Sequence, residues 1–156
     1  MVAILIICLV QSLQTDLRVM LDEAYKSETA AIEMRTYLRS LKSPGATEKA
    51  YMGTAEMLMA EHVYFPWSKL KHFHSGVDLI AQAAEMEPEN LEVRYLRFAC
   101  QTHTPSFLGY NDHIESDKKI LITKLPELQD QDLKKRIKIV LLESKHVSEK
   151  EKERVK

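Results

Sequence analysis

Three polar side chains recur at helical spacing in the second half of the chain. Arg94, Arg97 and Gln101 are separated by three and four positions, so they lie on one stripe of a helix. The irregular segment that follows adds Phe107 and Tyr110. Arginine guanidinium groups bind carboxylates with paired hydrogen bonds, and aromatic rings supply flat contact area. These five residues predict a patch that binds a peptide or another acidic group of a protein partner.

The same two arginines also fit a structural role inside the fold. Arg94 and Arg97 can pair with acids of the same chain, such as Glu92 or Asp117, and so hold the long loop that follows them. We favour this interpretation, because a buried or half-buried arginine usually has a partner within the fold. An Arg97→Ala variant distinguishes the partner-binding patch from the structural role. Lost thermal stability indicates an internal pair, and lost partner binding at unchanged stability indicates a recognition patch.

Six histidines raise the question of a metal site. His72 and His74 are two positions apart, so on a helix they point in nearly opposite directions. His62, His103 and His113 stand next to predicted loops, which can bring metal ligands together. No two histidines are four positions apart, and no two cysteines are close in sequence. We predict no metal, no cofactor and no catalytic residue. A helical metal protein or enzyme using the three loop histidines is the alternative function.

Composition narrows the classes of function further. The sequence has no Gly-x-Ser-x-Gly motif, no phosphate-binding glycine loop and no zinc-protease helix, so no enzyme class is indicated. The formal net charge of −1 argues against nucleic-acid binding through bulk charge. A basic cluster occurs at Lys134–Lys138. We interpret it as a solvated helix face and predict no nucleic-acid partner, with contact to nucleic acid or an anionic membrane as the less favoured alternative.

Five prolines divide the chain at nearly even intervals, at positions 44, 66, 88, 105 and 126. Proline ends or kinks helices, and apolar residues recur at helical spacing between the prolines. No convincing stretch alternates with the period of two that a strand requires. The sequence therefore predicts an all-α protein with six or seven short helices, arranged as antiparallel hairpins in a single domain over residues 13–147.

Three segments carry clear packing faces. The first is a mostly small face that lets a neighbouring helix approach closely, formed by Ala50, Gly53, Met57 and Ala60. The second is the strongest amphipathic stripe of the chain, formed by Leu70, Phe73, Val77, Ile80 and Ala84. The third marks the last predicted helix of the domain, with Leu133, Ile137, Val140 and Leu141.

The two ends of the chain differ from its body. Residues 1–10 form an uninterrupted apolar run, shorter than the about 20 residues that a membrane-spanning helix needs, so we predict no transmembrane segment. The run matches the core of a secretory signal peptide. We interpret residues 1–12 as that signal, which predicts an exported, periplasmic or envelope-associated protein. A buried first element of a cytoplasmic domain is the alternative. Residues 148–156 alternate in charge and are predicted to be a charged tail, as a frayed helix end or disorder.

The segment Gly76–Asn90 resembles the second helix and closing turn of a tetratricopeptide repeat. Gly76 and Ala83 stand at its two small positions, Ile80 at the bulky position and Pro88 at the turn. The preceding helix fits only if the residues around 62–67 are an insertion, so the resemblance is to a degenerate relative. Because such hairpins bind peptides or proteins in a concave groove, the resemblance implies a protein- or peptide-binding accessory or scaffold module.

A second resemblance covers most of the chain after the signal segment. The stretch Asn90–Phe98, followed by Pro105–Tyr110 and by Asp117 and Lys118, is similar to a family of small exported bacterial proteins. That resemblance implies export and brings no mechanism with it. The function predicted from the sequence is therefore binding of a protein or peptide, with the partner and the pathway undefined.

Overall fold

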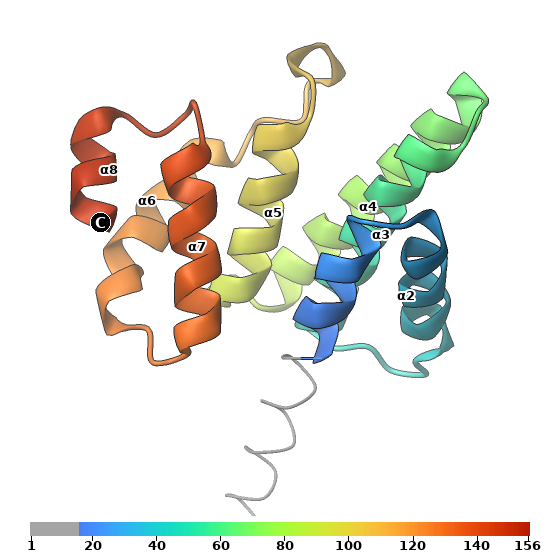
Figure 1. The fold of residues 1–156 in the computed structure, drawn as a ribbon, viewed down its shortest axis with the longest axis horizontal. Helices are drawn as coiled ribbons and strands as arrows, with labels where there is room; N and C mark the ends of the chain where they lie inside the picture. Colours follow the sequence, from blue (N-terminus) through green and yellow to red (C-terminus); the bar gives the residue numbers. More distant parts are fainter. Residues whose placement is uncertain (1–15) are drawn as a thin grey trace, which may run out of the picture. The chain divides into compact units, whose positions relative to one another are not determined.

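The computed structural model describes residues 16–156, and all of its regular elements in this range are helices. The helical segment 16–24 is followed by seven further α-helices and two short 3-10 turns. These are α2 (Glu28–Ser40), α3 (Ala46–His62), α4 (Pro66–Met86), α5 (Leu91–His103), η1 (Ser106–Leu108), α6 (Ile114–Lys124), η2 (Leu125–Glu127), α7 (Gln131–Glu143) and α8 (Glu149–Val155) (Figure 1). The all-α prediction is confirmed, with eight helices in place of six or seven.

The sequence makes one prediction about the N-terminus and one about membrane-spanning helices. The predicted signal peptide, residues 1–12, lies outside the described residues. Among the helices of residues 16–156, none combines the length and the apolar character needed to cross a bilayer. Tetratricopeptide-like packing of the hairpins stays a prediction.

The helices belong to two compact units that divide between Met86 and Glu87. This boundary falls in the turn that contains Pro88, one of the five predicted breaks. The first unit contains the helical segment 16–24 and α2 to α4, and the second contains α5 to α8. The single domain predicted over residues 13–147 stays a prediction, because a domain is defined by independent folding.

In the first unit, α3 and α4 form a long hairpin whose helices touch through two glycines. A Cβ atom on Gly53 would lie 2.7 Å from the carbonyl oxygen of Gly76, and one on Gly76 would lie 2.7 Å from that of Gly53. Only glycine permits so close a backbone approach. The predicted small-residue face of α3 is therefore confirmed as a close helix contact.

The connection between α3 and α4 is shorter than the sequence suggests. Only residues 63–65 lie between the helices, and Pro66 opens α4 at the first helical position, where proline fits well. Of the residues around 62–67, His62 ends α3 while Pro66 and Trp67 begin α4, and the resemblance that treats them as an insertion stays a prediction. The apolar stripe of α4 also needs correction, since Leu70 is exposed and Ala83 is buried while Ala84 is only half-buried.

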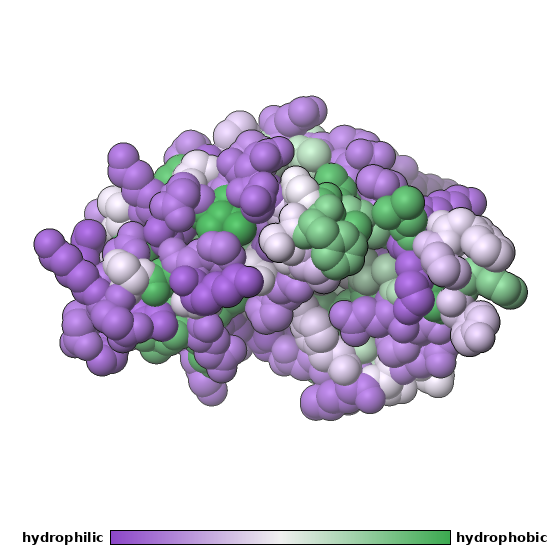
Figure 2. Space-filling view, turned by 90° about the horizontal axis from the view of Figure 1, so that it is seen from above, coloured by the Kyte–Doolittle hydropathy of each residue, from purple (hydrophilic) through white to green (hydrophobic). Residues whose placement is uncertain are grey.

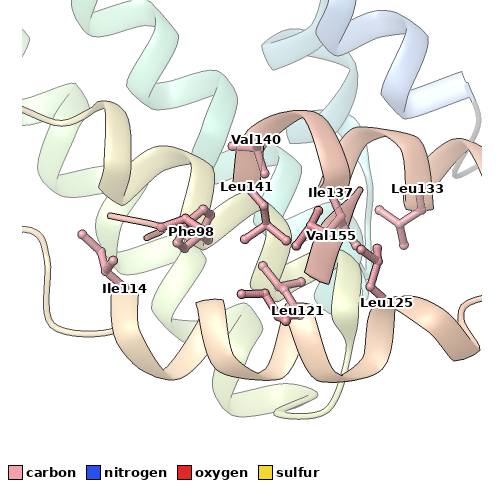
Figure 3. Packing of buried hydrophobic residues seen from close by; sticks show 11 residues of the cluster. Phe98, Ile114, Leu121, Leu125, Leu133, Ile137, Val140, Leu141 and Val155 are labelled. Atoms are coloured by element: carbon pink, nitrogen blue, oxygen red, sulfur yellow. The ribbon is translucent and has the colours of Figure 1, made fainter. Parts of the chain in front are cut away.

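The second unit has a core built from all four of its helices. Phe98 comes from α5, Leu121 from α6, Ile137 and Leu141 from α7, and Val155 from α8. Their side chains point toward one another in Figure 3. The face predicted for the last helix of the domain is confirmed, because the buried residues of α7 are Leu133, Ile137, Val140 and Leu141.

The charged C-terminal segment is an ordered helix, which corrects the expected fraying or disorder of residues 148–156. Ser148 begins α8 with a capping box, in which its side chain accepts from the Glu151 N–H and Glu151 accepts from the Ser148 N–H. Val155 is buried in the core of the second unit. Lys118 on α6 donates to the carbonyl oxygen of His146 over 3.0 Å and lies 3.3 Å from Glu151. Charge alternation here reflects the solvated face of a packed helix.

Candidate functional site

Asp117 on α6 is the acceptor for both arginines of the predicted patch. Its carboxylate is fully buried. Arg97 donates from Nε to Oδ2 over 2.7 Å and from Nη2 to Oδ1 over 2.8 Å, which is the two-pronged geometry of a strong ion pair. Arg94 donates from Nη1 to Oδ1 over 2.8 Å. The arginine stripe of α5 therefore joins α5 to α6, which is the internal pairing that the sequence analysis favours.

Gln101 fixes the far end of the loop between α5 and α6. Its side chain is buried, and Oε1 accepts a hydrogen bond from the backbone N–H of His113 over 3.2 Å. At the near end of the loop, the hydroxyl of Thr104 donates to the carbonyl oxygen of Cys100 over 2.7 Å. Both ends of the loop 104–113 are therefore attached to α5.

The two aromatic residues of the predicted patch differ in exposure. Tyr110 is half-buried, and burial raises the pKa of its hydroxyl, with a smaller contribution in the same direction from the nearby thiol of Cys100. Phe107, on the turn η1, is 85% exposed. Of the five residues predicted to form the patch, Phe107 alone presents its whole side chain to solvent.

The three loop histidines do not come together in one metal site within the described residues. His103 Nδ1 lies 2.8 Å from the carbonyl oxygen of Ala99 in the same helix. His113 stands at the N-cap position of α6, and His62 is the exposed last residue of α3. Within residues 16–156, no group of three or more His, Cys, Asp or Glu side chains is arranged to hold a metal ion. No observation favours the metal-binding alternative.

The second unit also contains a shallow hollow at the C-terminal ends of α5 and α7. Its lining combines uncharged and ionisable side chains, namely Thr102, His103, Val140, Glu143, Ser144 and Lys145. The hollow begins where the loop 104–113 leaves α5, because Thr102 and His103 are the last residues of that helix. A concave surface thus adjoins the base of the loop that carries Phe107.

A buried carboxylate in the first unit escaped the sequence analysis. Glu56 on α3 accepts from Arg35 Nε over 2.8 Å and from Arg39 Nη2 over 2.5 Å, both on α2. Its other oxygen lies 2.7 Å from Nδ1 of His72 on α4. Burial raises the pKa of Glu56, but hydrogen bonds from His72 and Arg35 outweigh it and hold the pKa below its ordinary value. The ionised carboxylate joins three helices, and periodicity cannot reveal partners 16 to 21 residues away.

A second feature that sequence analysis did not single out is the aromatic turn, defined as Tyr64, Phe65 and Trp67. Tyr64 is 88% exposed, Phe65 51% and Trp67 68%. The rings of Phe65 and Trp67 are stacked with centroids 4.7 Å apart, and Tyr64 meets Phe65 edge-on at 5.5 Å. Three aromatic residues within four positions around Pro66 were the available signal.

The basic cluster on α7 makes local contacts. Arg136 Nε donates to Asp132 Oδ2 over 2.9 Å, one turn earlier in the same helix. Lys134 Nζ donates to the carbonyl oxygen of Pro126, and Lys138 Nζ donates to that of Lys156. Of the basic residues in the cluster, only Lys135 is exposed, and the interpretation of the cluster as a solvated helix face stays a prediction.

No protein-family model, curated protein or solved structure matches this chain. The resemblances to tetratricopeptide repeats and to small exported bacterial proteins therefore stay predictions. A fold alone is in any case weak evidence for a function. The functional argument accordingly rests on the contacts, burial and charge of the chain's own residues.

Proposed function

We propose that this chain is a protein- or peptide-binding module, acting as an accessory or scaffold, and that the loop 104–113 carries its contact surface. One observation carries the proposal: Phe107 is 85% exposed on a loop whose two ends are held to α5 by partly buried hydrogen bonds. Aromatic residues, Phe among them, are enriched at protein interfaces relative to the rest of the protein surface.

The loop is ordered before any partner binds. Gly109 follows the last residue of η1 at φ 68°, a conformation that glycine adopts readily, and its backbone N–H donates to the carbonyl oxygen of Ser106. The Arg97–Asp117 pair holds together the two helices that the loop connects. A partner that meets Phe107 loses little binding free energy to ordering of the loop, which is the advantage of a preorganised contact. In this proposal the hollow beside His103 receives the rest of the peptide.

The proposal includes an exported location, periplasmic or envelope-associated. The apolar run of residues 1–10 supports it, because it has the length and composition of a signal-peptide core. Mass spectrometry of the protein recovered from its native host tests this part separately. A mature N-terminus at Leu13 is the expected result, and an intact Met1 in the exported fraction contradicts it.

Peptide selection tests the binding function. A displayed random-peptide library is selected on the full chain, and the enriched peptides are then measured against Phe107→Ala. We expect their dissociation constants to rise about tenfold or more, as truncation of an anchor residue does. The matched control is Ile139→Ala, another exposed apolar residue, which lies on α7 and should bind as the unchanged chain does. Failure to enrich peptides, or equal binding by Phe107→Ala, contradicts the proposal.

A further inference from the structure

We propose that the aromatic turn docks on the surface of an anionic lipid bilayer. It lies in the first unit, with Tyr64 and Phe65 between α3 and α4 and Trp67 in the first turn of α4, and shares no residue with the loop 104–113. In Figure 1 this end of the hairpin extends past α2, so the turn is not covered by the other helices of its unit. Figure 2 views the molecule from that side and shows hydrophobic patches among hydrophilic residues.

The side chains of the turn have the chemistry of a membrane interface. Tryptophan and tyrosine are enriched where hydrocarbon meets headgroups, because each joins an apolar ring to a polar N–H or O–H. Phe65, stacked on Trp67, adds a wholly apolar ring. Such a small protruding cluster is suited to enter the headgroup region to a shallow depth, as interfacial anchors do.

The charge around the turn fits a negatively charged surface. No acidic residue occurs between Glu61 and Asp78, whereas Lys69 and Lys71 in this interval are exposed. Asp78 follows Trp67 by eleven positions, which places it about 16 Å farther along the helix. Exposed lysines beside an apolar cluster attract an anionic leaflet and hold the cluster against it.

Two of the side chains that follow the aromatic turn, Lys71 and His74, share a face of α4 with Trp67. Trp67, Lys71 and His74 follow one another at intervals of four and three, which is one stripe of α4, and all three are exposed. The buried acid of the same hairpin, Glu56, is already neutralised by Arg35 and Arg39. At this end of the hairpin, the exposed Lys69 and Lys71 outnumber the exposed Glu61, and the buried acid Glu56 is already paired.

These features favour a bilayer over a second protein as the occupant. Anchors at protein interfaces lie at the centre of a patch from which charged side chains are depleted. Here Lys69 and Lys71 directly follow the aromatic residues at a hairpin end. A bilayer accepts this pattern, because rings enter the interface while lysine side chains reach the phosphates.

Trp67 is the only tryptophan of the chain, so tryptophan fluorescence reports on the aromatic turn alone. The full chain is titrated with vesicles of equal parts phosphatidylglycerol and phosphatidylcholine, and with vesicles of phosphatidylcholine alone. We expect the Trp67 emission to shift to the blue with the anionic vesicles and to be quenched by brominated acyl chains. Added salt should weaken the response. The apolar residues 1–10 carry no tryptophan, so their own contact with lipid does not produce this signal.

Two double variants locate the binding surface. Lys69→Glu with Lys71→Glu should weaken binding about tenfold or more. Lys134→Glu with Lys135→Glu makes the same charge change on the basic cluster of α7 and should leave binding unchanged. Circular dichroism confirms that both variants are folded, and Phe65→Ala provides a variant without any charge change, expected to bind more weakly.

Several results would overturn the proposal that the aromatic turn docks on an anionic bilayer. An unchanged Trp67 emission in the presence of anionic vesicles overturns the proposal, even if the protein sediments with them through another surface. Equal shifts with neutral vesicles, or loss of binding in the α7 variant alone, also overturn it. A Trp67 shift on adding the selected peptides without vesicles would assign the turn to a protein partner. Because the peptide test depends on Phe107 and this one on residues 64–71, either proposal can fail alone.

Discussion

Asp117 is the residue on which the α5–α6 contact depends most. Its fully buried carboxylate receives three hydrogen bonds from two guanidinium groups that are themselves almost buried. A carboxylate that is charged and buried is stable only while such donors surround it. The two arginines depend on Asp117 in turn, because without its carboxylate the guanidinium groups of Arg94 and Arg97 would be left as buried cations.

We expect Asp117→Asn to lower the free energy of unfolding by about 3–5 kcal/mol, because it removes one charge of a buried pair and leaves the other uncompensated. Urea denaturation at neutral pH measures this. The matched control is Asp132→Asn, whose partner Arg136 lies one turn away near the surface and whose loss should cost less than about 1 kcal/mol. Equal losses in the two variants would mean that the Asp117 pair is solvated.

At the scale of single residues, sequence analysis found an ion pair only where the spacing of the arginines had first directed attention to the acids near them. It named Asp117 as an acid that Arg94 and Arg97 can reach, and the structure places it there. It could not find the Glu56 contacts, because Arg35 and His72 come from different helices on either side of α3. Spacing along one helix contains no information about which neighbouring helix lies alongside.

Among the elements, the α3–α4 hairpin is held at its crossing by Gly53 and Gly76. A Cβ on Gly76 would meet the Gly53 carbonyl oxygen at 2.7 Å and Met57 Cγ at 2.4 Å. The side chain of Met57 can move, but the backbone of α3 can move only if the helices separate. Separation would loosen the packing around Ile80, which lies on the same face.

We therefore expect Gly76→Ala to lower the free energy of unfolding by about 1–3 kcal/mol, although alanine has the higher helix propensity by about 1 kcal/mol. Thermal and urea unfolding measure the difference. Gly45→Ala is the control, because its Cβ would meet only the flexible end of Glu48. Replacing this N-cap glycine by alanine should lower the free energy of unfolding by less than about 1 kcal/mol. A stabilised Gly76→Ala protein would show that the helices do not touch there.

The capping box of α8 makes the stability of the second unit depend on pH. Hydrogen bonds from the side chain and backbone of Ser148, with a smaller contribution from Lys118, outweigh the opposing effect of burial and together lower the pKa of Glu151 from 4.5 to about 2. Since the folded pKa is below the unfolded one, this contribution is complete above about 4.5. It is lost as the pH falls through about 2.

We expect an NMR titration of the Glu151 carboxyl carbon to show a midpoint near 2 in the folded protein. The Ser148→Ala variant should move the midpoint toward the ordinary value, since it removes the hydroxyl donor while keeping the backbone N–H. It should also destabilise the protein by about 1 kcal/mol at neutral pH through loss of the cap. A midpoint near 4.5 in the unchanged chain would contradict the capping box.

The elements also show why some helices are easier to predict than others. α7 has one buried face, so the periodicity of its apolar residues identified all four buried positions. α5 is buried on most of its surface, including Glu92, Arg97 and Gln101. The polar residues of α5 therefore do not mark its exposed face. The stripe of α4 fails at Leu70 because the end of the hairpin has no neighbouring helix to cover it.

For the whole molecule, the question is whether the two compact units unfold together. The sequence predicts one domain over residues 13–147, with no signal at Pro88 stronger than at the other prolines. The structure contains a separate apolar core in the second unit and a boundary between Met86 and Glu87. Cores that are packed separately permit sub-global unfolding of one part while the other stays folded.

We expect native-state amide hydrogen exchange in two matched variants to show whether the two units unfold separately or together. Ile137→Ala removes a fully buried side chain from the core of α7, and Ile80→Ala removes one from α4. Each should cost about 2–5 kcal/mol. If the units unfold separately, Ile137→Ala accelerates exchange mainly in α5 to α8 and Ile80→Ala mainly in α2 to α4. Equal acceleration throughout the chain in both variants would instead establish one cooperative domain, because a cooperative domain exposes all its core amides in the same opening event.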